Sequence, residues 1–191
     1  TPIRLADYKK IIFFTGAGMS KESGIPTYRG EGGTWEKYNY RDYACQSAFE
    51  NDPEKVLIFH EKRRKEALSC KPHLGHRIIS KVANIHSSVY IITQNIDGMH
   101  QRSGSVNVIE LHGSLWRVRC SCKGVVEDIG HRYKYYTCPD CDKWLRPDIT
   151  WFEDELNMEK FNKSKSIIED SDLFISIGTS ATVYPAAGLP L

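Results

Sequence analysis

Several features that would assign the chain to a familiar class are missing. No apolar run approaches the ~20 residues of a membrane-spanning helix, so no membrane partner is predicted. Basic residues (26) barely outnumber acidic ones (24), and a formal net charge of +2 gives no reason to expect nucleic acid. There is no internal repeat or low-complexity tract, and 191 residues suffice for one domain with a good core and a small additional module.

The cysteines are too few and too unevenly spaced for a disulfide framework. Four of the six fall in two tight pairs, which indicates metal binding in a reducing compartment. No signal peptide opens the chain, and we therefore expect an intracellular protein, cytoplasmic in a bacterium, with mitochondria an open alternative in a eukaryote.

The stretch 11–30, IIFFTGAGMSKESGIPTYRG, predicts a buried parallel strand that leads into a phosphate-binding loop. Gly16 permits a tight turn, and Gly18 has no Cβ to keep a pyrophosphate away from backbone N–H groups. Lys21 stands where a dinucleotide fingerprint would place its third glycine, so an ordinary strand–turn–helix corner stays an alternative.

Polar residues follow the other predicted strands. Segments 88–92, 106–111 and 172–177 are predicted strands, and ligands gather at the carboxyl ends of such strands. The residues found there are Gln94, Asn95, Asp97, His112, Gly178, Thr179 and Ser180. No serine or cysteine nucleophile stands beside a base, which argues against acyl-enzyme hydrolysis, and a lone histidine such as His112 is more often structural than catalytic.

The cysteine pairs predict a zinc site in a stretch that otherwise lacks periodic apolar residues. C-x-C at Cys120 and Cys122 is followed, after fifteen residues, by C-x-x-C at Cys138 and Cys141. Four thiolates leave no open coordination position, so one zinc per chain would be structural. The short first pair leaves a distorted site, or replacement of one thiolate by His131, as alternatives, and free thiols are the remaining one.

Five blocks in order resemble the sirtuins, the NAD-dependent protein-lysine deacylases. They are GAGMSKESGIPTYRG, TQNIDGMH (93–100), ELHGSL (110–115), the paired cysteines and IGTSATVYPAAG (177–188). The resemblance implies that acyl-lysine oxygen attacks the nicotinamide-bearing ribose carbon, that nicotinamide leaves, and that the acyl group ends on ADP-ribose. It implies that His112 is the general base and that Asn95 is a second catalytic residue. The residues it assigns to NAD are Gly16, Ala17, Gly18, Ser20, Tyr28, Arg29, Gln94, Asn95, Asp97, Gly178, Thr179 and Ser180.

A predicted helix over 48–69 carries the acyl-group hypothesis. It resembles the sirtuin branch, bacterial and mitochondrial, whose Tyr-x-x-Arg pair recognises succinyl and malonyl groups, and here the pair reads His60-x-x-Arg63. Residues at i and i+3 share a helical face, and Ala44 matches a small residue that widens the acyl pocket of that branch. We expect succinyl-lysine to be processed at least as well as acetyl-lysine, with a preference that grows as pH falls toward the histidine pKa. The alternative is that the charges at 62–65 are a solvated face and the enzyme is a simple deacetylase.

The fold class implied is α/β, a Rossmann-like parallel sheet with a small zinc-binding module inserted. We expect the NAD-binding part over 1–115, the zinc module over 116–147 and a return to the first part over 148–191, which looks truncated against the family. The sequence departs from the usual sirtuin pattern at two positions, with Tyr28 in place of Phe and Glu153 in place of Gly. The segment 31–43 is expected to form a mobile lid. A catalytically weak NAD-sensing module and a Rossmann oxidoreductase are the competing functions, and acyl-lysine proteins or peptides are the expected partners.

Overall fold

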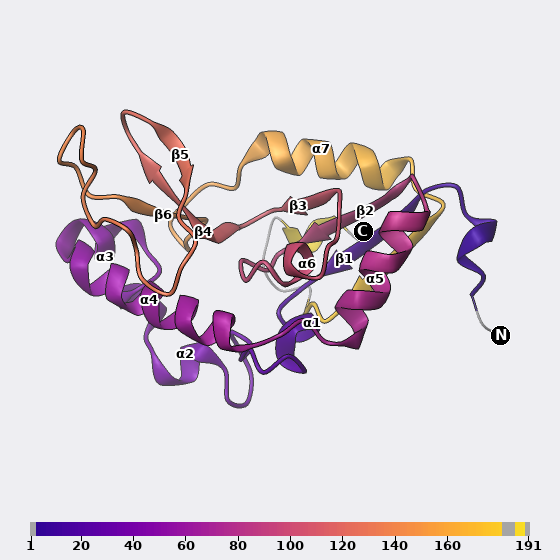
Figure 1. Ribbon diagram of the computed structural model, residues 1–191, viewed down its shortest axis with the longest axis horizontal. Helices are drawn as coiled ribbons and strands as arrows, with labels where there is room; N and C mark the ends of the chain where they lie inside the picture. Colours follow the sequence, from indigo (N-terminus) through magenta and orange to yellow (C-terminus); the bar gives the residue numbers. More distant parts are fainter. Residues whose placement is uncertain (1–2, 181–185, 190–191) are drawn as a thin grey trace.

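A four-stranded parallel sheet forms the centre of the computed structural model, which describes residues 3–180 and 186–189 (Figure 1). Its strands are β1 (Ile11–Thr15), β2 (Val89–Thr93), β3 (Val108–Glu110) and β7 (Leu173–Ile177), in the order β3-β2-β1-β7. All three pairings are parallel. The predicted Rossmann-like sheet is therefore confirmed.

The continuous apolar run of β1 is explained by helices on both faces of this sheet. Ile11 and Phe13 pack in one cluster with residues of α5 (Leu74–Ile85), whereas Ile12 and Phe14 point to the opposite face, where α7 (Met158–Glu169) covers them. Figure 1 shows the two helices on opposite sides of the strands. Every residue of β1 is buried, as expected for a central parallel strand.

A second, antiparallel sheet lies at the end of the molecule away from the N-terminus (Figure 1). It consists of β4 (Gly113–Cys120), β5 (Gly124–Glu127) and β6 (Arg146–Ile149), in the order β5-β4-β6. Because β4 starts directly after His112 and ends at Cys120, one strand connects the predicted base with the predicted metal site. The predicted boundaries at 115/116 and 147/148 fall inside β4 and β6, and the division into parts stays a prediction.

The remaining elements are α3 (Gln46–Asn51), α4 (Pro53–Ser69) and several short turns of helix. The predicted helix over 48–69 is wrong as a single helix, because α3 ends before α4 begins. The Asp52 side chain accepts a hydrogen bond from Lys55 N–H (2.9 Å) and Pro53 opens α4, a typical helix start. The other short elements are η1 (Leu5–Asp7), α1 (Gly18–Lys21), α2 (Thr34–Lys37), η2 (Tyr40–Asp42), α6 (Met99–Arg102) and η3 (Ala186–Gly188).

The segment 31–43, which is predicted to form a mobile lid, packs its aromatic side chains on neighbouring elements, and its mobility stays a prediction. Trp35 lies against Tyr28 and Phe59, with ring centroids 5.5 Å and 6.2 Å apart, and against Tyr40 at 6.4 Å. Glycines and charges in this segment favoured mobility, and many of its residues are exposed, but Trp35 and Tyr38 pack on Phe59 of α4.

In the part of the chain that the structure describes, no helix combines the length and the apolar character needed to span a bilayer.

Candidate active site

The loops after β1 and β7 touch through glycines. Gly16 N–H donates to the Ile177 carbonyl (3.0 Å) and Gly18 N–H to the Gly178 carbonyl (2.8 Å). A Cβ on Gly16 would lie 2.7 Å from the Gly178 oxygen, and one on Gly18 would lie 2.8 Å from the Gly178 Cα. Gly178 itself has a φ of +64°, which disfavours other residues. These glycines are thus required for contact between two loops, a reason that the sequence did not reveal.

Asn95 is held at the carboxyl end of β2 by three hydrogen bonds. Its Nδ2 donates to the Gly16 carbonyl (3.0 Å) and to Ser20 Oγ (3.3 Å), and its main-chain N–H donates to Thr93 Oγ1 (3.0 Å). The side chain therefore bridges the β2 end to the loop after β1.

Asp97 is a buried carboxyl group two residues further on. Burial raises its pKa, while hydrogen bonds from the Met99 main chain and from Ser20 oppose that rise. The Met99 N–H lies 2.9 Å from Asp97 Oδ1. Asn95 and Asp97 consequently share Ser20 as a partner in the cofactor loop.

His112 is positioned by the main chain of Gln94. Its Nδ1 lies 3.1 Å from the Gln94 carbonyl, and because a carbonyl only accepts, Nδ1 carries the hydrogen and Nε2 keeps a lone pair. Burial lowers the His112 pKa, and the Gln94 carbonyl partly offsets this effect. The Gln94 side chain donates to Thr179 Oγ1 (2.9 Å). A neutral imidazole with a free Nε2 is the form that a general base requires.

A pocket is lined by Ser20, Asn95 and Asp97, whereas His112, Gln94 and Thr179 are not among its lining residues. Twelve residues from the segment after β1, α4, the 95–97 segment and β4 line it: Ala17, Ser20, Ile25, Pro26, Tyr28, Arg63, Glu66, Ala67, Asn95, Ile96, Asp97 and Leu115. Buried polar groups at the carboxyl ends of parallel strands fit the ribose and amide groups of a dinucleotide. Arg29 and Ser180 are exposed and do not line the pocket. Within the block 177–188, residues 181–185 lie outside the described residues.

Arg63 reaches this pocket, and it is not a solvated surface cation. Its side chain is 8% exposed, and Nη1 donates to Thr34 Oγ1 (2.9 Å) and to Glu66 Oε2 (3.3 Å). The guanidinium carbon lies 5.3 Å from the Tyr28 ring centroid. The solvated-face alternative is therefore wrong for Arg63, and also for the fully buried Arg64.

His60 lies apart from the residues that line the pocket. Its ring stacks on Trp151, with centroids 5.9 Å apart and planes at 12°, and it packs edge-on against Phe59. Burial, with a further contribution from Arg63, lowers its pKa to about 3. The lowered pKa argues against the expected gain of charge on His60 as pH falls toward the ordinary histidine value. Ala44 is buried and accepts a hydrogen bond from Phe152 N–H (3.1 Å), so it joins the Trp151 segment instead of lining the pocket.

Some partners of the site were not predicted from the sequence. Thr34 and Glu66 flank Arg63, and Thr15 connects His100 Nε2 (2.9 Å) with Thr93 Oγ1 (2.9 Å) beneath Asn95. Only Glu66 carried a signal in the sequence, its i+3 spacing from Arg63 on α4.

The four predicted zinc ligands come together. Their Sγ atoms all lie within 4.8 Å of one another, with Cys120 and Cys122 3.2 Å apart and Cys122 and Cys138 3.6 Å apart. Edges of about 3.8 Å are expected in a tetrahedral zinc–thiolate site with bonds of about 2.3 Å. The four sulfurs, Cys141 included, therefore fit a structural zinc ion, and His131 is not part of the group.

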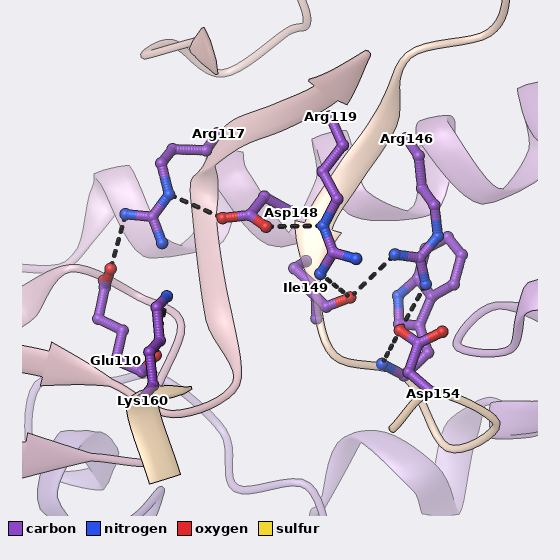
Figure 2. Close-up of polar contacts among 9 residues, drawn as sticks. Glu110, Arg117, Arg119, Arg146, Asp148, Ile149, Asp154 and Lys160 are labelled. Carbon is purple, nitrogen blue, oxygen red and sulfur yellow. Dashed lines mark hydrogen bonds and ion pairs between the residues drawn. The ribbon is translucent and has the colours of Figure 1, made fainter. Parts of the chain in front are cut away.

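Ion pairs join the module to the parallel sheet, as Figure 2 shows. Arg117 on β4 donates to Glu110 Oε2 at the end of β3 (2.7 Å) and to Asp148 Oδ2 on β6 (2.8 Å), and Arg119 donates to Asp148 Oδ1 (2.7 Å). Burial favours a higher Asp148 pKa, but the two guanidinium groups outweigh it and hold the pKa low. Glu110 and Asp148 flank the His112–Gly113 corner, so this network fixes the strand that carries the base.

The fold and site define a nucleotide-binding α/β protein with a four-cysteine module. The sequence model of the Sir2 family matches residues 16–185. The chain is 42% identical over 182 residues to NAD-dependent protein deacylase 1 of Caldanaerobacter subterraneus subsp. tengcongensis, covering 94% of this chain and 75% of the relative.

Solved structures give the same result. A Sir2 homologue in complex with ADP-ribose superposes with a TM-score of 0.90 at 38% identity, covering 97% of this chain and 76% of that one. A Sir2 homologue–NAD complex gives a TM-score of 0.87 at 38% identity over 97% and 74% of the two chains. The chain therefore belongs to the Sir2 family.

Proposed function

We propose that this chain is an NAD-dependent protein-lysine deacylase that removes succinyl and malonyl groups as well as acetyl. The deacylase activity is supported by the family, by Asn95 and Asp97 in the pocket after β2, and by the hydrogen bond that joins His112 to the main chain of Gln94 beside them. The observation that supports the acidic acyl groups is the buried Arg63 in the same pocket.

The chain's own residues would divide the work as follows. Bound NAD supplies the ribose carbon that accepts the acyl oxygen as nicotinamide leaves. His112 Nε2 takes a proton from a ribose hydroxyl, since its Nδ1–H is engaged by the Gln94 carbonyl. Asn95 and Asp97 hold the ribose and carboxamide region, and Tyr28 shields the reacting centre beside them.

Arg63 is suited to a carboxylate at the far end of the acyl chain. The hydrogen bonds of Arg63 to Thr34 and Glu66 both leave from Nη1, and its guanidinium also hydrogen-bonds the Tyr28 side chain, so a bidentate carboxylate would share the guanidinium with these groups. Removal from water strengthens the attraction in such a pair, and because Arg63 is already buried, only the incoming carboxylate adds a desolvation cost on binding. His60, neutral and stacked on Trp151, would contribute shape to the wall behind Arg63 and not charge.

A simple deacetylase is the second candidate, and Glu66 favours it. This carboxylate lies 3.3 Å from Arg63 Nη1 and already neutralises part of the charge that a succinyl group would meet. An acidic acyl group must compete with Glu66, whereas an acetyl group need not.

Replacing Arg63 separates the two candidates. Arg63→Met should lower kcat/KM for succinyl-lysine peptide by at least about 30-fold, the scale of a lost buried charge pair, and change deacetylation by less than about threefold. Lys65→Met, an exposed cation on the same helix, is the matched control and should change neither activity. Glu66→Gln should raise desuccinylation by removing the competing carboxylate. If Arg63→Met lowered both activities equally, Arg63 would be structural and the acidic-acyl proposal would be wrong.

A further inference from the structure

Trp116 occupies the middle of β4, between the predicted base and the predicted metal ligands. Its indole Nε1–H donates to the main-chain carbonyl of Asp97 (2.9 Å). The preceding residue, Leu115, donates its N–H to the Ile96 carbonyl (2.9 Å). Two consecutive residues of β4 therefore hold two consecutive carbonyls of the segment that carries Asp97.

The 96–98 segment is shaped to receive this indole. Gly98 has a φ of +70°, and a Cβ built on it would lie 2.5 Å from Trp116 Nε1 and 2.9 Å from Cδ1. Any larger residue would push the ring away from the Asp97 carbonyl. The glycine of the NIDG sequence is thus required both by its backbone angle and by the indole beside it.

Trp116 is also tied to the cysteine module. Its main-chain carbonyl accepts a hydrogen bond from Asp128 N–H (2.9 Å), and its ring lies 5.7 Å from the guanidinium carbon of Arg64. Arg64 is fully buried, pairs with Asp128 Oδ1 at 2.7 Å and lies over the Tyr133 ring at 4.2 Å. The module, α4 and the cofactor segment consequently meet at one side chain.

We propose that Trp116 is a positioning residue for NAD binding: by holding the Asp97 main chain it sets the Asp97 carboxyl group, and it makes that position depend on the folded module. The inference rests on the proposed function, because it assigns Asp97 to the cofactor. The alternative is that Trp116 only fills space, in which case its ring is needed but its N–H group is not.

The indole N–H can be removed while an aromatic ring is kept. Trp116→Phe should weaken NAD binding, measured by calorimetry, about five- to tenfold, the range expected for one lost hydrogen bond to a buried carbonyl. KM for NAD should rise by the same factor and kcat should change less than twofold, since Asp97 acts in binding. Zinc content and melting temperature should stay close to those of the parent protein. Trp144→Phe, an exposed tryptophan of the module, is the control and should change none of these values.

Two results would overturn the inference. One is unchanged NAD affinity in Trp116→Phe, and the other is a loss of affinity that comes only with a loss of zinc and of thermal stability. If the phenylalanine variant does not fold, Trp116 can be replaced by benzothienylalanine, which keeps the bicyclic shape but lacks the N–H. The NAD affinity of that protein, measured in the same way, then tests the inference. Failure of the proposed function is distinguishable from failure of this inference. It would appear in the parent protein as no release of nicotinamide with an acyl-lysine peptide, independently of the NAD affinities measured by calorimetry.

Discussion

Lowering the pH should destabilise this protein through His60, and the effect can be isolated by one substitution. The side chain is 4% exposed, and neither ring nitrogen makes a hydrogen bond of ordinary geometry within the described residues. Burial and then the nearby Arg63 lower its pKa to about 3 from the ordinary value of 6.5. The Tyr43 main chain opposes this shift, but it is outweighed.

The sign and size follow from proton binding in the two states. Between about pH 3 and 6.5 the unfolded chain binds a proton at His60 that the folded chain does not, so the free energy of unfolding falls as pH falls through this window. Each pKa unit is worth about 1.4 kcal/mol, so the loss from His60 at pH 5 is about 2 kcal/mol relative to pH 8. Above pH 7 both states are neutral at this residue and the contribution disappears.

His60→Phe is the informative variant, because it removes the titrating group and keeps a ring to stack on Trp151. Chemical denaturation followed by tryptophan fluorescence at pH 8 and at pH 5 gives the free energy of unfolding of both proteins. The parent should lose about 2 kcal/mol more than the variant between these pH values. Other buried histidines, His76 and His100, contribute to both proteins and cancel. Equal losses would show that His60 has the same pKa in the folded and unfolded protein, a smaller loss in the parent would show that its folded-state pKa is raised, and either result would refute the reasoning.

Two further predictions concern the base and the metal. His112→Ala should lower kcat about 10²–10⁴-fold while NAD affinity by calorimetry changes little, because a general base acts in the chemical step; unaltered turnover would remove His112 from that role. A strong chelator should release about one zinc ion per chain and lower the melting temperature, as structural sites do; elemental analysis of the purified protein that finds no metal would contradict the four-cysteine site.

The sequence predicted the parts of the fold that depend on short-range pattern. The IIFF run, the glycines after it and the spacing of Cys120, Cys122, Cys138 and Cys141 are local signals, and the sheet and the cysteine cluster follow them. The charge run at 62–65 favoured a solvated helix face, which is wrong for Arg63 and Arg64. The sequence pattern does not show that Thr34 contacts Arg63 and that Asp128 pairs with Arg64, because both partners come from other segments of the chain. The same limit explains His60: its i+3 spacing from Arg63 is a property of α4, whereas the burial that lowers its pKa involves Trp151, whose ring stacks on it from ninety-one residues later in the sequence.

Strand β4 explains why a metal site without an open coordination position can still matter for the reaction. Gly113, the residue after the predicted base, presses so closely on β6 that a Cβ there would lie 1.9 Å from the Asp148 carbonyl oxygen. Thr150 N–H donates to the His112 carbonyl (2.9 Å), so β6 also holds the base's own main chain. The last residue of β4, Cys120, pairs with Gly124, the first residue of β5. Loss of the metal would release this end of β4, whereas the hydrogen bonds of Arg117 and Arg119 to Asp148 would still hold β4 to β6. Damage at the cysteines would therefore reach Trp116, and with it Asp97, before it reached His112, so that weaker NAD binding precedes loss of the chemical step.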